Sequence, residues 1–295
     1  MSISPRYTIH QYREDMFKVV AFKGVRDSDI YVLRNREDQQ HNDNKLSSNF
    51  SRARSMVLQY ALCNPWDYFF TGTLDQCKFN RYSLDPFASR LSQFVRDKRK
   101  FYQSQIQVLL VPEHHQDGAW HMHGLIYGLP DRVLRPFRPP EPKHLIDGGF
   151  LNWPDYQRKF GFCSLAPIRD PVATAYYISK YVSKDLSKRG GDLGKHLYFH
   201  SRPLKKADPV SDVYMYQREL EECCTHDYEF CKVGMVHNAP WYFPLIWDGM
   251  ELRAGDLPDP DAPAAVPVLD PLAGFDPATV DPFYEQLNIA GWSSG

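Results

Sequence analysis

The chain has 295 residues, of which 43% are hydrophobic and 24% charged, with a formal net charge of −1 at pH 7. This length and hydrophobic content allow one large domain or two small ones with a real core, and they exclude a chain that is disordered throughout. No run of 18 apolar residues exists and the N-terminus lacks the pattern of a signal peptide, so we expect no membrane association and a cytoplasmic protein.

The charge is unevenly distributed along the chain. Residues 251–295 contain eight Asp or Glu against one Arg, together with seven of the 23 prolines. This composition predicts a disordered acidic tail. The rest of the chain holds 34 Lys and Arg against 28 Asp and Glu. Its basic runs RDKRK (96–100) and SKDLSKR (183–189) are candidates for contact with a phosphate backbone, although such runs are commonly solvated helix faces. The candidate DNA-binding residues are Arg96, Lys98, Arg99, Lys100, Lys188 and Arg189.

The first elements in chain order are two short strands, FKVVAF (17–22) and DIYVL (29–33), followed by a polar linker, NREDQQHNDN (35–44). A helix is predicted over residues 51–63, and WDYFFTGTL (66–74) follows as an aromatic strand. A second helix begins near Asp85-Pro86 and ends in the RDKRK run.

The next segments predict a strand hairpin at the centre of the fold. QIQVLLVPE (105–113) reads as a buried strand and AWHMHGLIYG (119–128) as its partner across a turn. FGFCSLAPI (160–168) predicts another strand, and YFHSRPL (198–204) a further one. Strands and helices alternate around this hairpin. The pattern therefore predicts an α+β fold, with a central, mainly antiparallel sheet backed by helices.

Two histidines in the hairpin suggest a metal site. His121 and His123 are two residues apart on a strand, so they share one face about 6.6 Å apart. Two imidazoles alone would hold a hard cation weakly, which calls for a third ligand. If residues 116–118 form a three-residue loop, Glu113 faces His121; if the turn has two residues, His114 takes that place. We favour Glu113, and His114 remains the alternative.

The segment YYISKYVSK (176–184) predicts a helix with tyrosines away from its apolar stripe. Asp170 and Pro171 provide its start, and Gly190-Gly191 its end. The apolar stripe consists of Ala175, Ile178, Val182 and Leu186. The opposite side, which we expect to face outward, carries Tyr177, Tyr181, Lys184 and Lys188, with Lys180 beside them. Tyr176 lies at the flank and is predicted to be structural.

These parts fit a metal-assisted phosphoryl transfer to tyrosine. A divalent cation on the histidines would polarise a phosphate oxygen, and a tyrosine hydroxyl would attack the phosphorus. Tyrosine has an ordinary pKa near 10, so nearby Lys180 and Lys184 would help by favouring the phenolate or by holding phosphoryl charge. DNA is the natural diester substrate.

The order FFTGTLD (69–75), HMH (121–123) and YISKYVSK (177–184) resembles the three motifs of HUH-superfamily rolling-circle replication initiators. It looks most like their two-tyrosine branch in phages, plasmids and integrated elements of bacteria. The resemblance covers roughly residues 49–206. It implies metal-dependent nicking of single-stranded origin DNA, with Mg²⁺ or Mn²⁺, a covalent 5′-phosphotyrosine and strand joining. His121, His123 and Glu113 match the metal ligands, and Tyr177 and Tyr181 match the nucleophiles, each followed by a lysine, Lys180 and Lys184.

The resemblance also implies a domain organisation and partners. We expect an N-terminal strand-rich extension (1–45), the endonuclease domain (46–210), a C-terminal extension of that domain (211–250) and the tail (251–295). No Walker A motif is seen, so a host helicase and a polymerase are expected partners in the bacterial cytoplasm. Gly72 departs from the bulky apolar residue usual in the first motif. An HUH transposase or relaxase, or a non-catalytic origin-binding protein, remains the alternative reading.

Overall fold

The computed structural model describes residues 7–22, 38–115, 117–182, 197–210, 223–227 and 231–237. The chain divides into two compact units. The larger unit is Asn35–Lys205, and the smaller combines Met1–Arg34 with Lys206–Gly295. Each unit has a sheet of its own, and the motifs of the sequence lie in the larger one.

The larger unit is built on a seven-stranded sheet in the order β6-β7-β8-β3-β5-β4-β9. Its neighbouring strands pair antiparallel. The strands are β3 (Tyr68–Gly72), β4 (Gln107–His114), β5 (Trp120–Tyr127), β6 (Arg135–Pro136), β7 (Leu151–Asn152), β8 (Cys163–Pro167) and β9 (Phe199–His200). The α+β class and the central antiparallel sheet carrying the histidine hairpin are thus confirmed.

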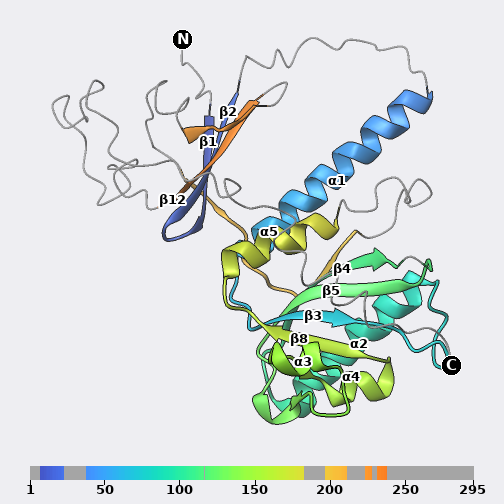
Figure 1. Cartoon of the computed structure of the whole chain (residues 1–295). Helices are drawn as coiled ribbons and strands as arrows, with labels where there is room; N and C mark the ends of the chain where they lie inside the picture. Colours follow the sequence, from blue (N-terminus) through green and yellow to red (C-terminus); the bar gives the residue numbers. More distant parts are fainter. Residues whose placement is uncertain are drawn as a thin grey trace, which may run out of the picture. The chain divides into compact units, whose positions relative to one another are not determined.

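Helices cover both faces of this sheet. They are α1 (Asp38–Cys63), α2 (Leu84–Tyr102), α3 (Lys143–Asp147), α4 (Pro154–Lys159) and α5 (Pro171–Tyr181), with a short 3-10 helix at Asp131–Val133. Figure 1 shows α1 and α5 on one side of the sheet, and α2, α3 and α4 on the other. On the histidine face, α5 packs along α1 and against β4 and β5, so a helix covers part of this face.

The main core lies between the sheet and α2 with α4. Phe94 of α2 and Phe160, which follows α4 directly, pack in one buried cluster with Met122 and Ile126 of β5. On a strand, side chains two residues apart share a face, so Met122 and Ile126 lie opposite His121 and His123. One face of β5 therefore builds the core, and the other presents the histidines.

The smaller unit has a five-stranded sheet in the order β10-β1-β2-β12-β11, and its paired strands are antiparallel. The strands are β1 (Tyr7–Arg13), β2 (Met16–Phe22), β10 (Asp208–Val210), β11 (His226–Asp227) and β12 (Cys231–His237). Its small core includes Val19, Cys223, Cys224 and Val236. Disulfide bonds are not formed by the described cysteines, Cys63, Cys77, Cys163, Cys223, Cys224 and Cys231.

Several predicted element boundaries need correction. The segment 35–44 is not a linker throughout, because α1 already begins at Asp38. β1 was not predicted at all, and the predicted strand at residues 29–33 lies outside the described residues. The predicted end of the tyrosine helix at Gly190-Gly191 also lies outside them; α5 ends at Tyr181 with Val182 in a helical conformation.

Within the described part of the chain, no helix combines the length and the apolar character needed to cross a membrane. The predicted domain bounds stay predictions.

Candidate active site

The turn between β4 and β5 sets which side chains face the histidines. The His115 amide donates to Ala119 O at 2.8 Å, and Gly118 has φ +80°, the left-handed region that glycine enters without strain. In this register Glu113 lies opposite His121. The preferred loop is therefore confirmed. The alternative register is wrong, since His114 pairs with Trp120 on the other face and stacks on its ring with centroids 3.6 Å apart.

Glu113 and His123 form a buried pair at the centre of the site. Glu113 Oε2 lies 2.8 Å from His123 Nε2, and the two side chains are 5% and 4% exposed. On the other edge of the ring, His123 Nδ1 lies 3.2 Å from Thr71 Oγ1 of β3. A buried imidazole bonded at both nitrogens has its orientation and tautomer restricted.

His121 is held from the hairpin loop. Its ring stacks on His115, with centroids 4.7 Å apart and planes 7° apart. Asp117 fixes the loop, because its Oδ1 accepts from the Ala119 amide and contacts His115 Nδ1, and its Oδ2 pairs with Arg81 at 3.1 Å. Burial lowers the pKa of His121 to about 4, and the nearby charges of His123 and His115 add to this effect. His121 is thus neutral at pH 7, the form that binds metals.

The donor set suits a divalent cation, although the three groups are not gathered around one point. Two ligands bonded at 2.1 Å and at right angles lie about 3.0 Å apart, close to the Glu113–His123 separation of 2.8 Å. His121 instead stacks on His115. Within the described residues, no group of three or more His, Cys, Asp or Glu is close enough to hold a metal ion. Two donors are therefore in ligand-like proximity, and the third would have to turn its ring.

The tyrosine helix begins as predicted. Asp170 is the N-cap and accepts hydrogen bonds from the amides of Val172 and Ala173 at 2.9 Å, while Pro171 occupies the first helical position. The predicted stripe residues Ala175, Ile178 and Val182 are buried. The cap and the stripe together place Tyr177 and Tyr181 on the histidine face of the sheet.

Of the two predicted nucleophiles, Tyr181 contacts His123 directly, and Tyr177 is linked to Tyr181. The ring of Tyr181 stacks on His123, with centroids 4.2 Å apart and planes 20° apart. Its hydroxyl donates to the Tyr177 hydroxyl at 2.7 Å, and Tyr177 packs against Phe69 with centroids 5.4 Å apart. Tyr177, Tyr181, His123 and Glu113 are therefore linked in one cluster through these contacts.

The outward orientation predicted for these tyrosines is wrong. Tyr181 is only 3% exposed and Tyr177 is half-buried, because α5 has the sheet on one side and α1 on another. Tyr176 is buried, at 7% exposed, in agreement with a structural role. Lys180 is half-buried. The remaining predicted lysines, Lys184 and Lys188, and also Arg189, lie outside the described residues.

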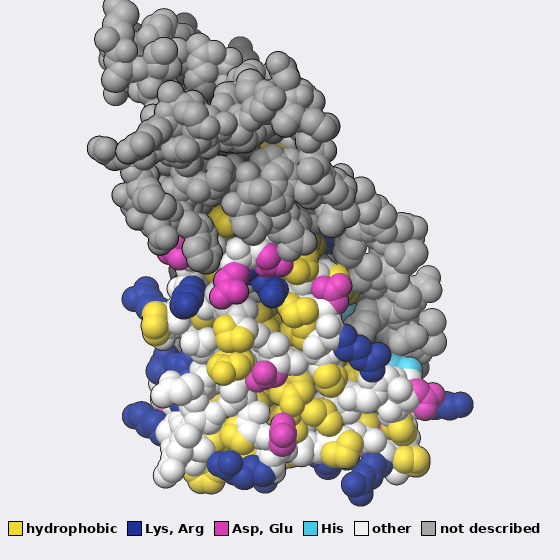
Figure 2. Space-filling view, turned by 90° about the vertical axis from the view of Figure 1, so that its left-hand side faces the viewer, with side chains coloured by type: hydrophobic (Ala, Val, Ile, Leu, Met, Phe, Trp, Pro, Cys, Tyr) yellow, Lys and Arg dark blue, Asp and Glu magenta, His cyan; other side chains and the backbone are white. Residues whose placement is uncertain are grey.

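The basic run on α2 is not a uniform solvated patch. Arg96 and Lys100 are exposed, but Lys98 forms an ion pair with Asp155 of α4. Arg99 donates to Ile106 O and, at 2.6 Å, to Ser201 Oγ. Lys98 and Arg99 thus make internal contacts, and their predicted contact with DNA stays a prediction. Figure 2 shows basic side chains spread around one face, with acidic and hydrophobic ones between them.

Gly72 has a structural explanation. A Cβ atom built there would lie 2.5 Å from the Phe70 ring and 2.5 Å from the Tyr156 hydroxyl. Tyr156 of α4 is fully buried and bonds to Thr73 O at 3.3 Å. The space that a bulky residue would need is therefore already filled.

Sequence reasoning missed the residues that support the site. Thr71 lies inside the quoted first motif, one residue before the glycine, and alternation along the strand places it on the histidine face. No sequence pattern identifies His115 or the Arg81–Asp117 pair, because their contacts depend on how the turn folds.

The fold and the cluster define an α+β domain with a histidine hairpin facing two helical tyrosines. Residues 67–186 match a family model whose description begins "Replication-associated protein ORF2". This match confirms the resemblance to rolling-circle replication initiators. It supports a role in replication initiation and, in general terms, an endonuclease activity. No curated protein gives a significant match. No solved structure does so either.

Proposed function

We propose that the larger unit is a metal-dependent endonuclease and strand-transferase that nicks single-stranded origin DNA through a tyrosine. The observation that carries this proposal is the cluster at β5 and α5: Tyr181 stacked on His123, and its hydroxyl 2.7 Å from that of Tyr177. If Tyr177 and Tyr181 served only to pack the helix, their hydroxyl groups would not be needed next to the His123–Glu113 pair.

His121, His123 and Glu113 would hold Mg²⁺ or Mn²⁺ in this proposal. The ion, when bound, supplies a Lewis acid for a phosphate oxygen. The buried Glu113 would compensate positive charge and keep His123 oriented, with Thr71 on the far side of the ring.

The chemical step is a transesterification that one tyrosine begins. The hydroxyl oxygen of Tyr177 or Tyr181 attacks the phosphorus, a tyrosine–phosphate bond forms, and the bond to the 3′ oxygen breaks. The tyrosine proton leaves the phenol and the departing 3′ oxygen takes up a proton, so a free 3′-OH remains. One phosphate ester replaces another, which needs no external energy source. The reverse reaction with a second 3′-OH joins strands.

The two tyrosines differ in access, which suggests their order. Tyr177 is half-buried and Tyr181 is 3% exposed, so a phosphodiester reaches Tyr177 first. A hydrogen bond from the other phenol would stabilise negative charge on the attacking oxygen. We therefore assign the first nick to Tyr177 and a later transfer to Tyr181.

The test is trapping of a covalent adduct. Wild-type protein, single-stranded DNA that carries its origin, and Mn²⁺ should give a protein–DNA band that resists denaturant. His121→Ala and His123→Ala should abolish the band while largely sparing DNA binding. A covalent adduct in the Tyr177→Phe/Tyr181→Phe double variant would exclude both tyrosines. Binding without any adduct in the wild type would instead favour a non-catalytic origin-binding protein.

Replication from the nick also requires unwinding of the duplex and synthesis of new DNA. We propose that a host helicase unwinds the duplex and a host polymerase extends the free 3′-OH, both in the bacterial cytoplasm.

A further inference from the structure

A row of alternating rings and cations runs across α2 and α4. The Lys98 ammonium lies 5.0 Å from the Phe101 ring centroid and 5.5 Å from that of Phe94. The Lys159 ammonium lies 5.3 Å from Phe94 and 5.7 Å from Phe160. These four distances are within the range of cation–π contacts. We call Phe101, Lys98, Phe94, Lys159 and Phe160 the ring–cation row.

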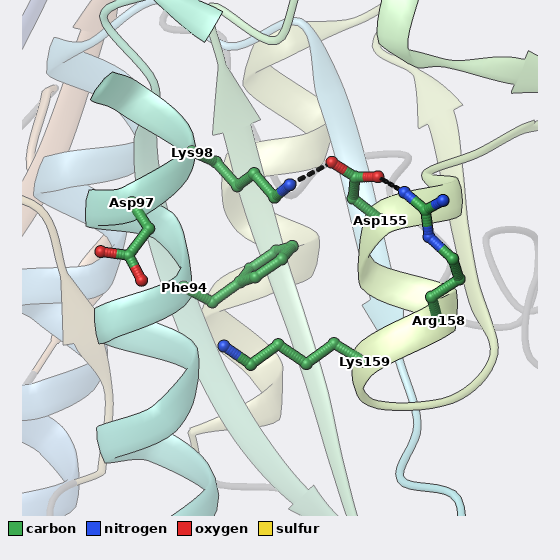
Figure 3. A pocket seen from close by; sticks show the side chains of 6 residues that line it. All are labelled: Phe94, Asp97, Lys98, Asp155, Arg158 and Lys159. Atoms are coloured by element: carbon green, nitrogen blue, oxygen red, sulfur yellow. Dashed lines mark hydrogen bonds and ion pairs between the residues drawn. The ribbon is translucent and has the colours of Figure 1, made fainter. Parts of the chain in front are cut away.

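The row borders a shallow hollow between the two helices. The hollow is lined by Phe94, Asp97, Lys98, Asp155, Arg158 and Lys159, and its volume is about 410 Å³. Figure 3 shows Phe94 between Lys98 and Lys159, with Arg158 on the far side of Asp155. This volume is within the roughly 300–1,000 Å³ of small-ligand sites, so the hollow could accept one unit of a polymer.

The charge of the hollow is positive and partly uncompensated. Lys98 and Arg158 share a single carboxylate, Asp155. Within the described residues, Lys159 has ring contacts but no carboxylate partner, and it is exposed. A polymer with regularly spaced negative charges would supply the missing counter-charge.

Phe101 provides an exposed apolar surface at the end of the row. It is 77% exposed, although such rings are normally buried. Its edge contacts the buried Tyr102, with ring centroids 5.6 Å apart, and this contact helps to hold it in place. The stability of the fold therefore does not explain the position of Phe101.

We propose that the ring–cation row binds single-stranded DNA outside the nick site. Phe101 stacks on an unpaired base, and Lys159 with Arg158 contacts the neighbouring phosphates. Sites that bind single strands without sequence preference combine stacking rings with cations in this way. The row lies on the opposite face of the sheet from His121 and His123, because Phe94 packs in the core with Met122. The proposal rests on the proposed function, since it extends the same strand.

A single strand fits the row better than the other anionic polymers. In a duplex, the bases are stacked on one another and do not offer a face to Phe101. An acidic peptide would neutralise the charge of Lys159 but has no base to stack on the exposed Phe101 ring. Phe94 and Phe160 are buried and position the two lysines, whereas the exposed Phe101 can stack on a base while the exposed Lys159 and Arg158 reach phosphates beside it.

The test compares short and long oligothymidine, labelled with fluorescein, on the full-length protein without metal. About 8 nucleotides can occupy one subsite, whereas about 30 can reach two. Phe101→Ala should weaken binding of the long strand by about 5- to 160-fold and leave binding of the short strand unchanged. Phe101→Tyr keeps the ring and should bind as the wild type does.

The charge is tested by the salt dependence of the same binding. Lys159→Gln should reduce the slope of log K against log salt by about 0.7 for the long strand, the value for one phosphate contact. Arg90→Gln is the matched control, since Arg90 is an exposed cation on α2 that lies 5.3 Å from the Phe79 ring, outside the row. It should leave the slope unchanged.

The outcomes separate this proposal from the proposed function. If the wild type binds and nicks DNA but Phe101→Ala and Lys159→Gln bind the long strand as tightly as it does, the row is not a DNA site. Equal losses on duplex and single-stranded DNA would overturn the assignment to single strands. If the wild type forms no covalent adduct yet the two variants still lose binding to the long strand, the nickase proposal fails and the row stands.

Discussion

Thr71 supports one edge of His123, and its hydroxyl can be removed with little change in shape. The Thr71 Oγ1 atom lies 3.2 Å from His123 Nδ1, and the two residues are 6% and 3% exposed. The other ring nitrogen faces Glu113. Thr71→Val therefore leaves the Nδ1 atom without its hydrogen-bond partner in a buried position.

Two effects of known size follow from this change. A buried polar group that loses its partner costs about 1–3 kcal/mol, so the free energy of unfolding should fall by that amount. Loss of a residue that orients a metal-binding histidine costs about 10- to 100-fold in metal affinity or activity. We expect the Mn²⁺ concentration for half-maximal cleavage to rise by that factor, because the ring of His123 is no longer oriented from β3.

The assay measures urea unfolding and, separately, the Mn²⁺ dependence of adduct formation at saturating DNA. Thr73→Val is a matched control two residues along the chain, just after the end of β3. Thr73 Oγ1 donates to Phe162 O at 3.1 Å, so this variant should lose about 0.5–1.5 kcal/mol of stability but keep the Mn²⁺ midpoint. An unchanged midpoint in Thr71→Val, or an equal shift in Thr73→Val, would refute the positioning role of Thr71.

Three further changes test other parts of the unit. Tyr177→Phe should reduce the first nick by more than 10-fold and Tyr181→Phe should mainly impair joining, measured with labelled 5′ and 3′ ends; the reverse pattern would contradict the order of attack. Asp155→Asn should cost about 1.5–3 kcal/mol of stability at pH 7. Burial alone would raise the pKa of Asp155, but hydrogen bonds from Lys98 and Tyr102 outweigh this effect and lower that pKa. The contribution of the ionised Asp155 to stability is therefore complete above about pH 4, and it is lost as the pH falls through the lowered pKa. The difference from wild type in acid unfolding should shrink there, and a constant difference would argue against the ion pair. Gly72→Val should cost at least about 1–3 kcal/mol, measured by urea unfolding, since its Cβ meets Phe70 and Tyr156; wild-type stability would mean that these rings can move.

The hairpin could be predicted from the sequence because its physics is local. Asp117-Gly118 limits the turn to two common lengths, and each length fixes one register. The residue that faces His121 then follows from alternation along the strand. The same local logic gave the start of α5, since a capping Asp170 and a proline act within one turn of the helix.

The faces of α5 could not be predicted in this way. A helical projection separates apolar from polar residues, but it does not show how many neighbours a helix has. Tyr181 falls on the polar side and is nevertheless buried, because that side packs on His123 and Phe69 of the sheet. The internal contacts of Lys98 and Arg99 could not be predicted for a related reason. Their partners, Asp155 and Ser201, are distant in sequence and carry no local pattern.

The burial of Tyr181 also decides which substitution can reveal its chemistry. Its ring stacks on His123 and lies 6.3 Å from that of Phe69, so Tyr181→Ala would remove core packing along with the hydroxyl. Truncation of a buried aromatic side chain costs about 3–5 kcal/mol, enough to unfold a marginal domain. A loss of activity in that variant would therefore not distinguish packing from catalysis. Tyr181→Phe keeps the ring and removes only the oxygen that meets Tyr177, so a change in strand transfer there reports on the hydroxyl itself.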